Sequence, residues 1–501
     1  MTRAFTQPTM RLPSARALPL LLLSAAVACS VACTSETGDG VTGDEQYLTE
    51  HSDIIFSPAP AEASHLVRLA KEIDGAKKTI DIAIYSYRDA AIGEALARAV
   101  ARGVKVRFLY DQGSKDSHLP AASLATSTSG KLEANGVDVR YITKILHHKF
   151  MIVDGPRDDL ALAKSAHLVT GSANWTSSAA STFDENTIIF QKQPELVLRF
   201  QRDFDTMWAH SKDFVGKDFL YELSTSNIQD AAIPDTAHTS ALFTSANFTV
   251  KDTTFSVTPT NTVADALVAG INGATKSIHL ASTHLRSREV AEALIAKKKA
   301  TPALDVRVYL DGQEFIAAGT QDVQLAKVQT CLTTAGTSEA KKRDCLNNDF
   351  LFGYQVGSSG VDVRYKLYAY RWDASYAPQM HSKYMVVDGS KLYTGSYNLS
   401  DNSEHGTFEN ELLLEAPTHA RLIAAFEANF ESIWKTGRDE NKLAALDARM
   451  AEGGAFPIVF DPMALSSDEI TVLKDRIRTK CPAVDSDAFR SAATSHRVCT
   501  P

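Results

Sequence analysis

The chain has 501 residues, of which 44% are apolar, and its formal net charge at pH 7 is −8. A chain of this length holds about two or three domains with ordinary apolar cores. The acidic balance disfavours a protein that mainly wraps nucleic acid, because such proteins carry an excess of basic residues against the phosphates.

Residues 1–33 have the pattern of an export signal. Three arginines precede an apolar run at residues 17–28, which is too short to span a bilayer as a permanent helix. Either the signal is cleaved at the small residues before Cys29, or Cys29 or Cys33 carries a lipid. Residues 34–50 then form a flexible linker. We expect an exported protein, periplasmic or extracellular, that is either free or anchored to a membrane by lipid.

Four cysteines beyond the signal form two local pairs, Cys331 with Cys345 and Cys481 with Cys499. In an exported protein such pairs are typical of short-loop disulfides. The alternative is a metal site, but neither pair has C-x-x-C spacing or neighbouring histidines. We therefore expect two disulfides and no metal.

The chain contains one motif twice. The pattern H-x-K-x(4)-D occurs at residues 147–154 and 381–388, and each copy leads into G-S-x-N, at residues 171–174 and 395–398. One copy could be accidental, but two copies with the same sequel suggest a single active site built from two halves.

The duplication covers whole domains. Segments around the motifs recur in the same order, for example G-V-D-V-R-Y at residues 136–141 and 360–365. Short β-branched runs such as residues 79–85 and 104–110 alternate with helical segments such as residues 90–101. This alternation predicts an α/β fold with a mixed β-sheet flanked by helices in each repeat.

We place an N-terminal domain at residues 51–225, a C-terminal domain at residues 240–436, and a helical tail with a cysteine pair at residues 437–501. The second repeat carries an additional segment of about 40 residues after Asp311. Its aromatic loop at residues 368–376 is either a lid that contacts substrate or a packed surface loop.

The motif residues suit a phosphate better than a metal. His381 and Lys383 point to one face of a strand, and the Asp388-Gly389 turn brings the chain back beside them. The lysine would repel a cation but attracts an anion. The groups that we expect around the phosphate are His147, Lys149, Ser172 and Asn174 from the first repeat, and His381, Lys383, Ser396 and Asn398 from the second.

Two imidazoles at one phosphate permit a two-step reaction. One attacks phosphorus, and the other protonates the departing alkoxide while the lysines offset developing charge. Each imidazole needs a partner on its second nitrogen. Glu185 and Glu409 each lie eleven residues after a motif asparagine, so we expect them to orient the histidines. Asp154 and Asp388 either belong to the reaction centre or are structural turn residues.

The doubled motif resembles the phospholipase D superfamily, over about residues 52–436. The resemblance implies two tandem α/β sandwich domains that form a pseudo-dimer within a monomer, with the active site at their interface and no cofactor. It also implies a phosphohistidine on His147 and an acid/base role for His381. The residues that it implies for catalysis are His147, Lys149, Asp154, His381, Lys383 and Asp388.

The leading expectation is a phosphodiesterase that hydrolyses phospholipid head groups at a membrane surface, with or without transfer to alcohols. The alternatives are a metal-independent endonuclease acting on nucleic acid, a cardiolipin-synthase-like phosphatidyltransferase, and a non-catalytic relic. A relic is disfavoured because both sets of motif residues are intact. The remaining histidines without a counterpart in the other repeat are expected to be ordinary; they are His148, His167, His284 and His405.

Overall fold

The computed structural model describes residues 51–111, 123, 125–214, 228–234, 236, 238–347, 350–452 and 459–480. The expected export signal, the linker and the pair Cys481/Cys499 lie outside these residues. Within the described ranges, no helix combines the length and the apolar character that a membrane crossing requires.

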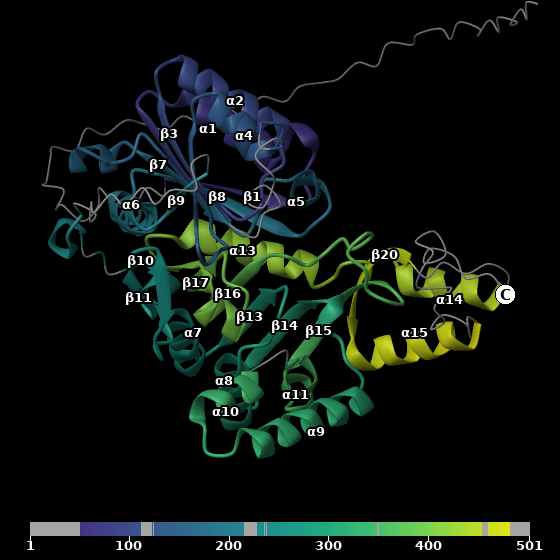
Figure 1. The fold of residues 1–501 in the computed structure, drawn as a ribbon. Coiled ribbons are helices and arrows are strands. Elements are labelled where there is room, and N and C mark those ends of the chain that lie inside the picture. The colour runs from purple at the N-terminus through teal and green to yellow at the C-terminus, as the bar shows by residue number, and fades with distance from the viewer. Residues whose placement is uncertain are drawn as a thin grey trace, which may run out of the picture. The chain divides into compact units, whose positions relative to one another are not determined.

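The first repeat is built on an eight-stranded mixed sheet with the order β1-β8-β7-β6-β2-β3-β4-β9 (Figure 1). Strands β2, β3 and β4 are mutually parallel, and the others pair antiparallel. The strands are β1 (Ser52–Ser57), β2 (Thr79–Ile84), β3 (Lys105–Asp111), β4 (Asp138–Ile142), β6 (Lys149–Val153), β7 (His167–Gly171), β8 (Glu185–Gln191) and β9 (Lys212–Asp213). The helices are α1 (His65–Gly75), α2 (Ala90–Ala101), α4 (Thr128–Ala134), α5 (Ser177–Ser181) and α6 (Pro194–Ala209).

The second repeat has the same architecture, with the order β10-β19-β17-β16-β13-β14-β15-β20. Its strands are β10 (Thr239–Phe243), β13 (Ser277–Ser282), β14 (Asp305–Asp311), β15 (Asp362–Ala369), β16 (Lys383–Val387), β17 (Lys391–Gly395), β19 (Asn410–Glu415) and β20 (Val459–Ser466). Its helices are α7 (Thr262–Gly273), α8 (Arg288–Ala300), α9 (Ala318–Ala335), α10 (Glu339–Asn347), α11 (Gly353–Ser358), α12 (Asp401–His405), α13 (Ala420–Ile433), α14 (Lys442–Glu452) and α15 (Ser467–Lys480). A hairpin, β11 (Phe248–Lys251) with β12 (Thr254–Val257), precedes α7.

The two sheets confirm the predicted α/β fold and its duplication. The motif strands β6 and β16 are buried along their whole length, as expected for central strands covered on both faces. The turn after β16 has Asp388 and Gly389 at φ values of 56° and 63°, and Ser390 N donates to Val387 O. These features match the tight hairpin turn that the Asp-Gly pair predicts.

The C-terminal segment differs from the predicted helical tail. Strand β20 extends the second sheet by pairing antiparallel with β15. Met463 and Leu465 in this strand are buried in the same core as Ile470 and Leu473 of α15. The apolar run before α15 therefore forms an edge strand, because pairing with β15 buries its apolar side chains in the core of the second repeat.

The two repeats share a hydrophobic core. Phe200 of α6 and Phe243 of β10 have ring centroids 5.0 Å apart. Helix α13 of the second repeat packs against β1 of the first, where Phe56 and Phe426 lie 5.1 Å apart (Figure 1). Continuous apolar packing between the repeats gives the active site a rigid frame.

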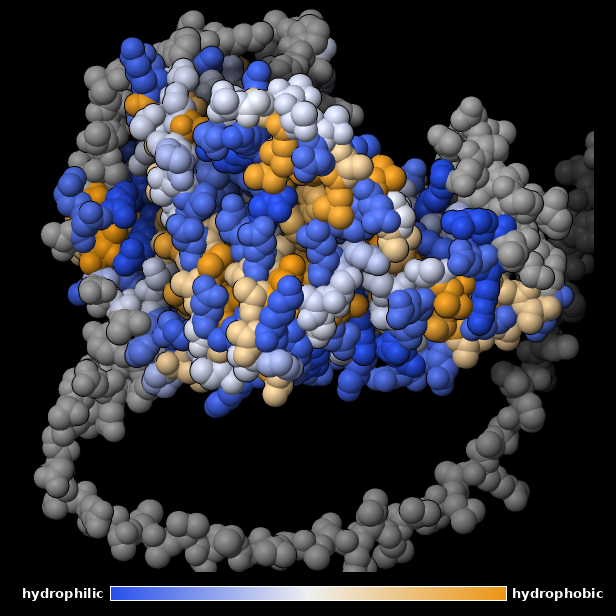
Figure 2. Space-filling model, turned by 90° about the horizontal axis from the view of Figure 1, so that it is seen from below, coloured by the Kyte–Doolittle hydropathy of each residue, from blue (hydrophilic) through white to orange (hydrophobic). Residues whose placement is uncertain are grey.

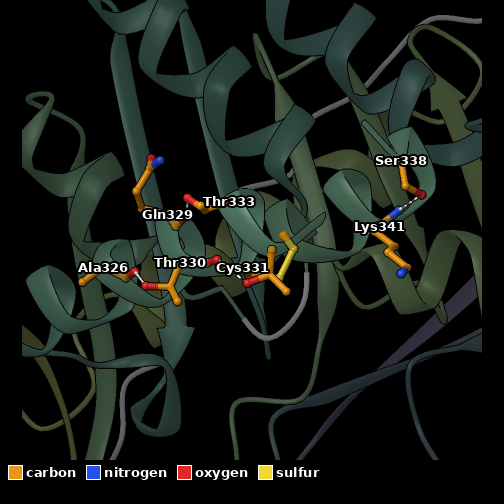
Figure 3. The surroundings of a disulfide bond; sticks show 9 residues. Ala326, Gln329, Thr330, Cys331, Thr333, Ser338 and Lys341 are labelled. Atoms are coloured by element: carbon orange, nitrogen blue, oxygen red, sulfur yellow. Dashed lines mark hydrogen bonds between the residues drawn. A yellow bond between two sulfur atoms is a disulfide. The ribbon is translucent and has the colours of Figure 1, made fainter. Parts of the chain in front are cut away.

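Helices α9 and α10 form the additional segment of the second repeat, and a disulfide joins Cys331 to Cys345 (Figure 3). This bond confirms the first expected cysteine pair. The segment has little core of its own, because α9 buries only Gln321 and Ala335 among its described residues. Figure 2, a view from below the molecule as drawn in Figure 1, shows a mostly hydrophilic face with its hydrophobic residues in separate groups.

Candidate active site

Each motif histidine pairs with a glutamate of the opposite repeat. His147 Nδ1 lies 2.9 Å from Glu409 Oε2, and His381 Nδ1 lies 2.6 Å from Glu185 Oε1. Both glutamates are 1% exposed, so water does not compete for these contacts. The sequence predicted the two glutamates from their matched offset, and the structure adds that the pairs cross between repeats.

Short backbone ladders between the repeats produce this crossing. Strand β5 (Ile145–Leu146) runs parallel to β18 (Thr407–Phe408), and His147 N donates to Phe408 O at 3.0 Å. The next residues in the two strands are therefore His147 and Glu409. The second pair follows the same logic, because His381 N donates to Asp184 O at 2.9 Å. Each histidine thus depends on backbone contacts made by both repeats.

The contacts of Glu409 fix the tautomer of His147. The Glu409 carboxylate accepts hydrogen bonds from Ser396 Oγ at 2.6 Å and from Thr407 Oγ1 at 2.9 Å. A carboxylate that already accepts two hydroxyls also accepts the Nδ1 proton of His147, which leaves Nε2 with its lone pair. A neutral imidazole in this orientation is a competent nucleophile.

The motif serines contact the glutamates, which differs from the phosphate contact that we expected. Ser396 Oγ donates its only hydroxyl proton to Glu409, so it has none to donate to a phosphate. The equivalent Ser172 lies beside Glu185 and lowers its pKa. Both hydroxyls also accept a backbone N–H of the following strand, from Asn186 and Asn410. The serines therefore hold the glutamates in place.

The two motif lysines are buried and lie close to the histidines. Lys149 Nζ donates to His147 O at 2.6 Å, and Lys383 Nζ donates to Thr283 Oγ1 at 3.3 Å. Burial lowers the pKa of Lys149 to about 7 and that of Lys383 to about 8. Lys383 Nζ also contacts the carbonyl oxygen and Nδ1 of His381. An ammonium has three protons, so Lys149, which uses one on His147 O, keeps donors for a phosphate. A bound dianion or monoanion would offset this concentrated positive charge.

The motif asparagines carry unused hydrogen-bonding capacity. Among the described residues, Oδ1 of Asn174 and Oδ1 of Asn398 are buried without a hydrogen-bond partner. Buried polar atoms are normally paired, so an unpaired amide at a reaction centre points to a ligand. The two amides thus have an unused acceptor at the centre, and a contact from their Nδ2 donors to a phosphate stays a prediction.

Burial and neighbouring charges set the protonation of the centre. Burial lowers the pKa of His147 well below 6.5, and the lysines Lys149 and Lys383 lower it further. Burial also lowers the pKa of His381. It raises the pKa of Glu185 and of Glu409 to about 7. The free site therefore favours neutral imidazoles around a cationic pocket, which suits a nucleophilic histidine.

We predict that kcat/KM for a phosphodiester falls as the pH rises through about 7 to 8. The reason is that Lys149 and Lys383 lose their protons in this window instead of near 10.5, and the phosphate then loses its cationic partners. A pH profile of kcat/KM measures the groups of the free enzyme. In Lys149→Arg, whose side chain stays charged, the alkaline limb should move up toward about 8, where Lys383 then sets it. An alkaline limb near pH 10 in both proteins would contradict this.

The motif aspartates lie away from the reaction centre. Asp154 accepts the backbone N–H groups of Lys77, Lys78 and Thr79 at 2.6–3.1 Å. It lies five positions after Lys149 along an extended strand, or about 16 Å away. Asp388 makes the equivalent contacts before β13. The structure thus corrects the catalytic role implied for both aspartates, since their carboxylates tie the motif hairpins to the start of β2 and β13.

We predict that Asp388→Asn lowers the free energy of unfolding by about 1–3 kcal/mol, because a charged acceptor of several backbone amides is lost. Burial alone would raise the pKa of Asp388, but hydrogen bonds from Lys276, Ser277 and Thr275 hold it below its usual value. Its contribution is therefore present above about pH 4 and is lost as the pH falls through the native pKa. Urea unfolding at pH 7 and pH 3 measures this difference. A loss of kcat without a loss of stability would instead assign Asp388 to catalysis.

A third imidazole–carboxylate pair stands beside the predicted centre. His284 Nδ1 lies 2.8 Å from Glu314 Oε1, and Arg286 Nη2 lies 2.7 Å from the same oxygen. Glu314 is fully buried. Sequence reasoning treated His284 as ordinary because the first repeat has Ser86 at the equivalent position. No repeat comparison could have found this pair, since it exists in one repeat only.

A polar cavity of about 690 Å³ opens at the centre and is lined by His147, Glu409 and Asn398 as well as by His284 and Arg286. Tyr85 also lines it and packs edge-on against His147, with ring centroids 4.7 Å apart. The cavity therefore joins residues of both repeats to the reaction centre.

The other unmatched histidines have local partners. His148 is buried and lies 3.0 Å from Asn410 Nδ2, and His167 lies 2.7 Å from Glu72. His405 pairs with Asp401 at 3.0 Å, but it also lines the cavity. The expectation of an ordinary role thus fits His148 and His167 better than His405.

The aromatic loop is packed along most of its length. Tyr368 and Tyr370 are buried, and the Tyr368 hydroxyl donates to Asp311 at 3.0 Å. Trp372 is 40% exposed. The loop was expected to be either a lid that contacts substrate or a packed surface loop, and the buried tyrosines fit the packed loop. In the part of the chain that the structure describes, no group of three or more histidines, cysteines or carboxylates is placed to hold a metal ion.

Comparison with known proteins identifies the family. The pattern described as "Cardiolipin synthase, PLD-like domain" matches residues 69–208 and 267–434, which together make up more than half of the chain. The chain belongs to the phospholipase D superfamily. Both matched segments contain one of the two motifs, so the family match and the crossed histidine–glutamate pairs concern the same residues.

Among curated proteins, the chain is similar to mitochondrial cardiolipin hydrolases. It is 31% identical to that of Danio rerio over 147 residues, which is 29% of this chain and 57% of the relative. It is 30% identical to that of Homo sapiens over 151 residues, or 30% of this chain and 53% of the relative. The chain thus spans about half the length of the curated relatives that it matches.

Among solved structures, the chain is similar to Nuc of Salmonella typhimurium, a phospholipase D family member, with 27% identity and a TM-score of 0.27. That match covers 32% of this chain and 96% of Nuc. It is also similar to phosphatidylserine synthase of Haemophilus influenzae, with 13% identity and a TM-score of 0.49 over 87% of this chain and 97% of the synthase.

Proposed function

We propose that the protein is a phosphodiesterase of the phospholipase D type that hydrolyses phospholipid head groups through a phosphohistidine. The observation that carries the proposal is the pair of crossed contacts, His147 with Glu409 and His381 with Glu185. They aim two imidazoles, backed by buried lysines, at one centre between the repeats. The family membership and the similarity to cardiolipin hydrolases support a phospholipid substrate.

In the first step, His147 Nε2 attacks phosphorus and forms an N–P bond. The P–O bond to the head-group alcohol breaks, and the electron pair leaves on the alkoxide oxygen. His381 becomes protonated when the anionic phosphodiester offsets the charge of the two lysines, and it donates this proton to the alkoxide oxygen, because an alkoxide is a poor leaving group near neutral pH. Lys149 and Lys383 offset the charge that develops on the non-bridging oxygens.

In the second step, water attacks the phosphorus of the phosphohistidine. His381, now neutral, takes the proton of the attacking water, and the N–P bond breaks to restore His147. The products are phosphatidic acid and the free alcohol. Glu185 keeps His381 in one orientation through both proton transfers, since its carboxylate stays on Nδ1.

The match to the cardiolipin-synthase type of domain favours a second candidate, in which an alcohol replaces water as the acceptor. The chemistry of the first step is unchanged, and the product is a new phosphodiester. The two candidates therefore differ only in the acceptor that attacks the phosphohistidine, which is water in hydrolysis and an alcohol in transfer.

A substrate panel tests the proposal. Vesicles of common phospholipids, with and without glycerol as an acceptor, and plasmid DNA are incubated with the protein in EDTA. We predict release of head group, full activity in EDTA and intact DNA. Release without glycerol supports hydrolysis, and a new lipid with glycerol supports transfer. Cleavage of DNA with intact vesicles, or loss of all activity in EDTA, would overturn the proposal.

A further inference from the structure

The cavity at the reaction centre is one-sided, although the centre itself is pseudo-symmetric. Its floor contains His147, Glu409 and Asn398, which have equivalents in the other repeat. Most of its wall comes from the second repeat alone, from the loop before α8, from α12 and from α10. The two repeats therefore contribute unequally to the surroundings of the centre.

Most of the charged groups on the cavity wall have an oppositely charged partner, either in the lining or buried behind it. His284 and Arg286 share the buried Glu314, and His405 pairs with Asp401. Asp344 adds a carboxylate on the α10 wall. Glu314 offsets the charge of Arg286, Asp401 faces His405, and Asp344 adds a further negative charge, so the wall offers no concentrated positive charge to a second phosphate.

The remaining lining groups suit hydroxyls. Asn347, Asn398 and Asn402 present amides, and Ser400 and Ser403 present hydroxyl oxygens. Amides and carboxylates together offer both donors and acceptors, which is what a hydroxyl, itself donor and acceptor, requires. Tyr85 is the single aromatic side chain among the described lining residues, whereas a quaternary ammonium is best held by several aromatic faces.

The α10 wall depends on the disulfide. Asn347 Nδ2 donates to Asp401 Oδ1 at 3.2 Å, and Arg288 Nη2 donates to Leu346 O at 2.6 Å. Few apolar contacts hold the segment otherwise, since α10 buries only Cys345 and Asn347 among its described residues. The bond from Cys331 to Cys345 therefore limits how far α10 can move from the cavity.

We propose that this cavity is the subsite for a polyhydroxylated head group, such as glycerol or inositol, and that the disulfide-braced α9–α10 segment sets its selectivity. This inference rests on the proposed phosphodiesterase function. It names Asn347 and Asn402 as specificity-determining residues that act on the head group and have no role at the phosphorus atom.

The test measures kcat/KM for phosphatidylglycerol, phosphatidylinositol, phosphatidylcholine and phosphatidylethanolamine with the same acyl chains in mixed micelles. We expect the two polyol lipids to exceed the two cationic ones by about tenfold or more, as a few additional hydrogen bonds would give. Bis(4-nitrophenyl) phosphate, which has no head group, is measured alongside. Cleavage of this diester with no preference for polyols overturns the inference alone, whereas failure on every diester overturns the proposed function.

Variants locate the selectivity. Asn402→Ala, at an exposed position on the wall, and Asn347→Ala should each reduce the ratio of phosphatidylglycerol to phosphatidylcholine at least about fivefold. The double variant Cys331→Ser/Cys345→Ser should reduce it as well. Gln329→Ala, on the exposed surface of α9 (Figure 3), is the matched control and should leave the ratio unchanged. An unchanged ratio in Asn402→Ala and in the double cysteine variant would contradict the inference.

Discussion

His147→Ala should lower kcat for any phosphodiester substrate by at least about 10⁴-fold, because it removes the nucleophile on which both steps depend. The loss should persist with a 4-nitrophenyl ester, since a better leaving group cannot replace an attacking group. The measurement is a steady-state rate with the folded state checked by circular dichroism.

The matched control is His167→Ala, a half-exposed histidine that pairs with Glu72 away from the cavity. We expect its kcat to stay within about threefold of the parent. If His147→Ala kept a rate comparable to that of the control, His147 would not be the nucleophile, and the proposed two-step route would have to be abandoned.

The crossed glutamates should have different kinetic signatures. Glu409→Gln and Glu185→Gln should each lower kcat on a phospholipid by about 10²–10⁴-fold, because the amide no longer fixes the tautomer of its histidine. With a 4-nitrophenyl ester the effect of Glu185→Gln on the first step should largely disappear, since nitrophenolate leaves without a proton from His381. The effect of Glu409→Gln should remain, since it orients the nucleophile.

This difference is measured as the pre-steady-state burst of nitrophenolate in each variant. The control is Glu415→Gln, which should behave as the parent. Glu415 is the last residue of β19 and accepts a hydrogen bond from Lys391. Equal loss of the burst in both glutamate variants would mean that the two pairs do not divide the roles of nucleophile and acid.

Much of the fold was predictable because its signals are local. The Asp-Gly turn after β16, the buried β-branched strands and the recurring G-V-D-V-R-Y segments each predict their structure from neighbouring residues. The C-terminal strand β20 was not predictable in this way. Whether an apolar run becomes a helix or an edge strand depends on the sheet edge that receives it, and that edge lies about 100 residues earlier in the chain.

In the candidate site, too, some residues were predictable from sequence and others depend on contacts between distant parts of the chain. The repeated motif identified His147, His381 and the two glutamates, because duplication makes functional residues recur at matched offsets. The crossing of the pairs depends on the β5–β18 ladder between the repeats. Strands of two residues are too short to be predicted from a sequence pattern. His284 with Glu314 was missed because the pair is unique to the second repeat.

The most direct test of the account is to trap the covalent intermediate. His381→Ala is mixed with a 4-nitrophenyl phosphodiester, which leaves without an acid, so that the first step proceeds while the second lacks its base. The protein is quenched at neutral to alkaline pH, digested and analysed by mass spectrometry. The account predicts the phosphorylated adduct on the peptide that contains His147. An adduct on any other residue, or hydrolysis by the parent enzyme with inversion at phosphorus, would contradict it.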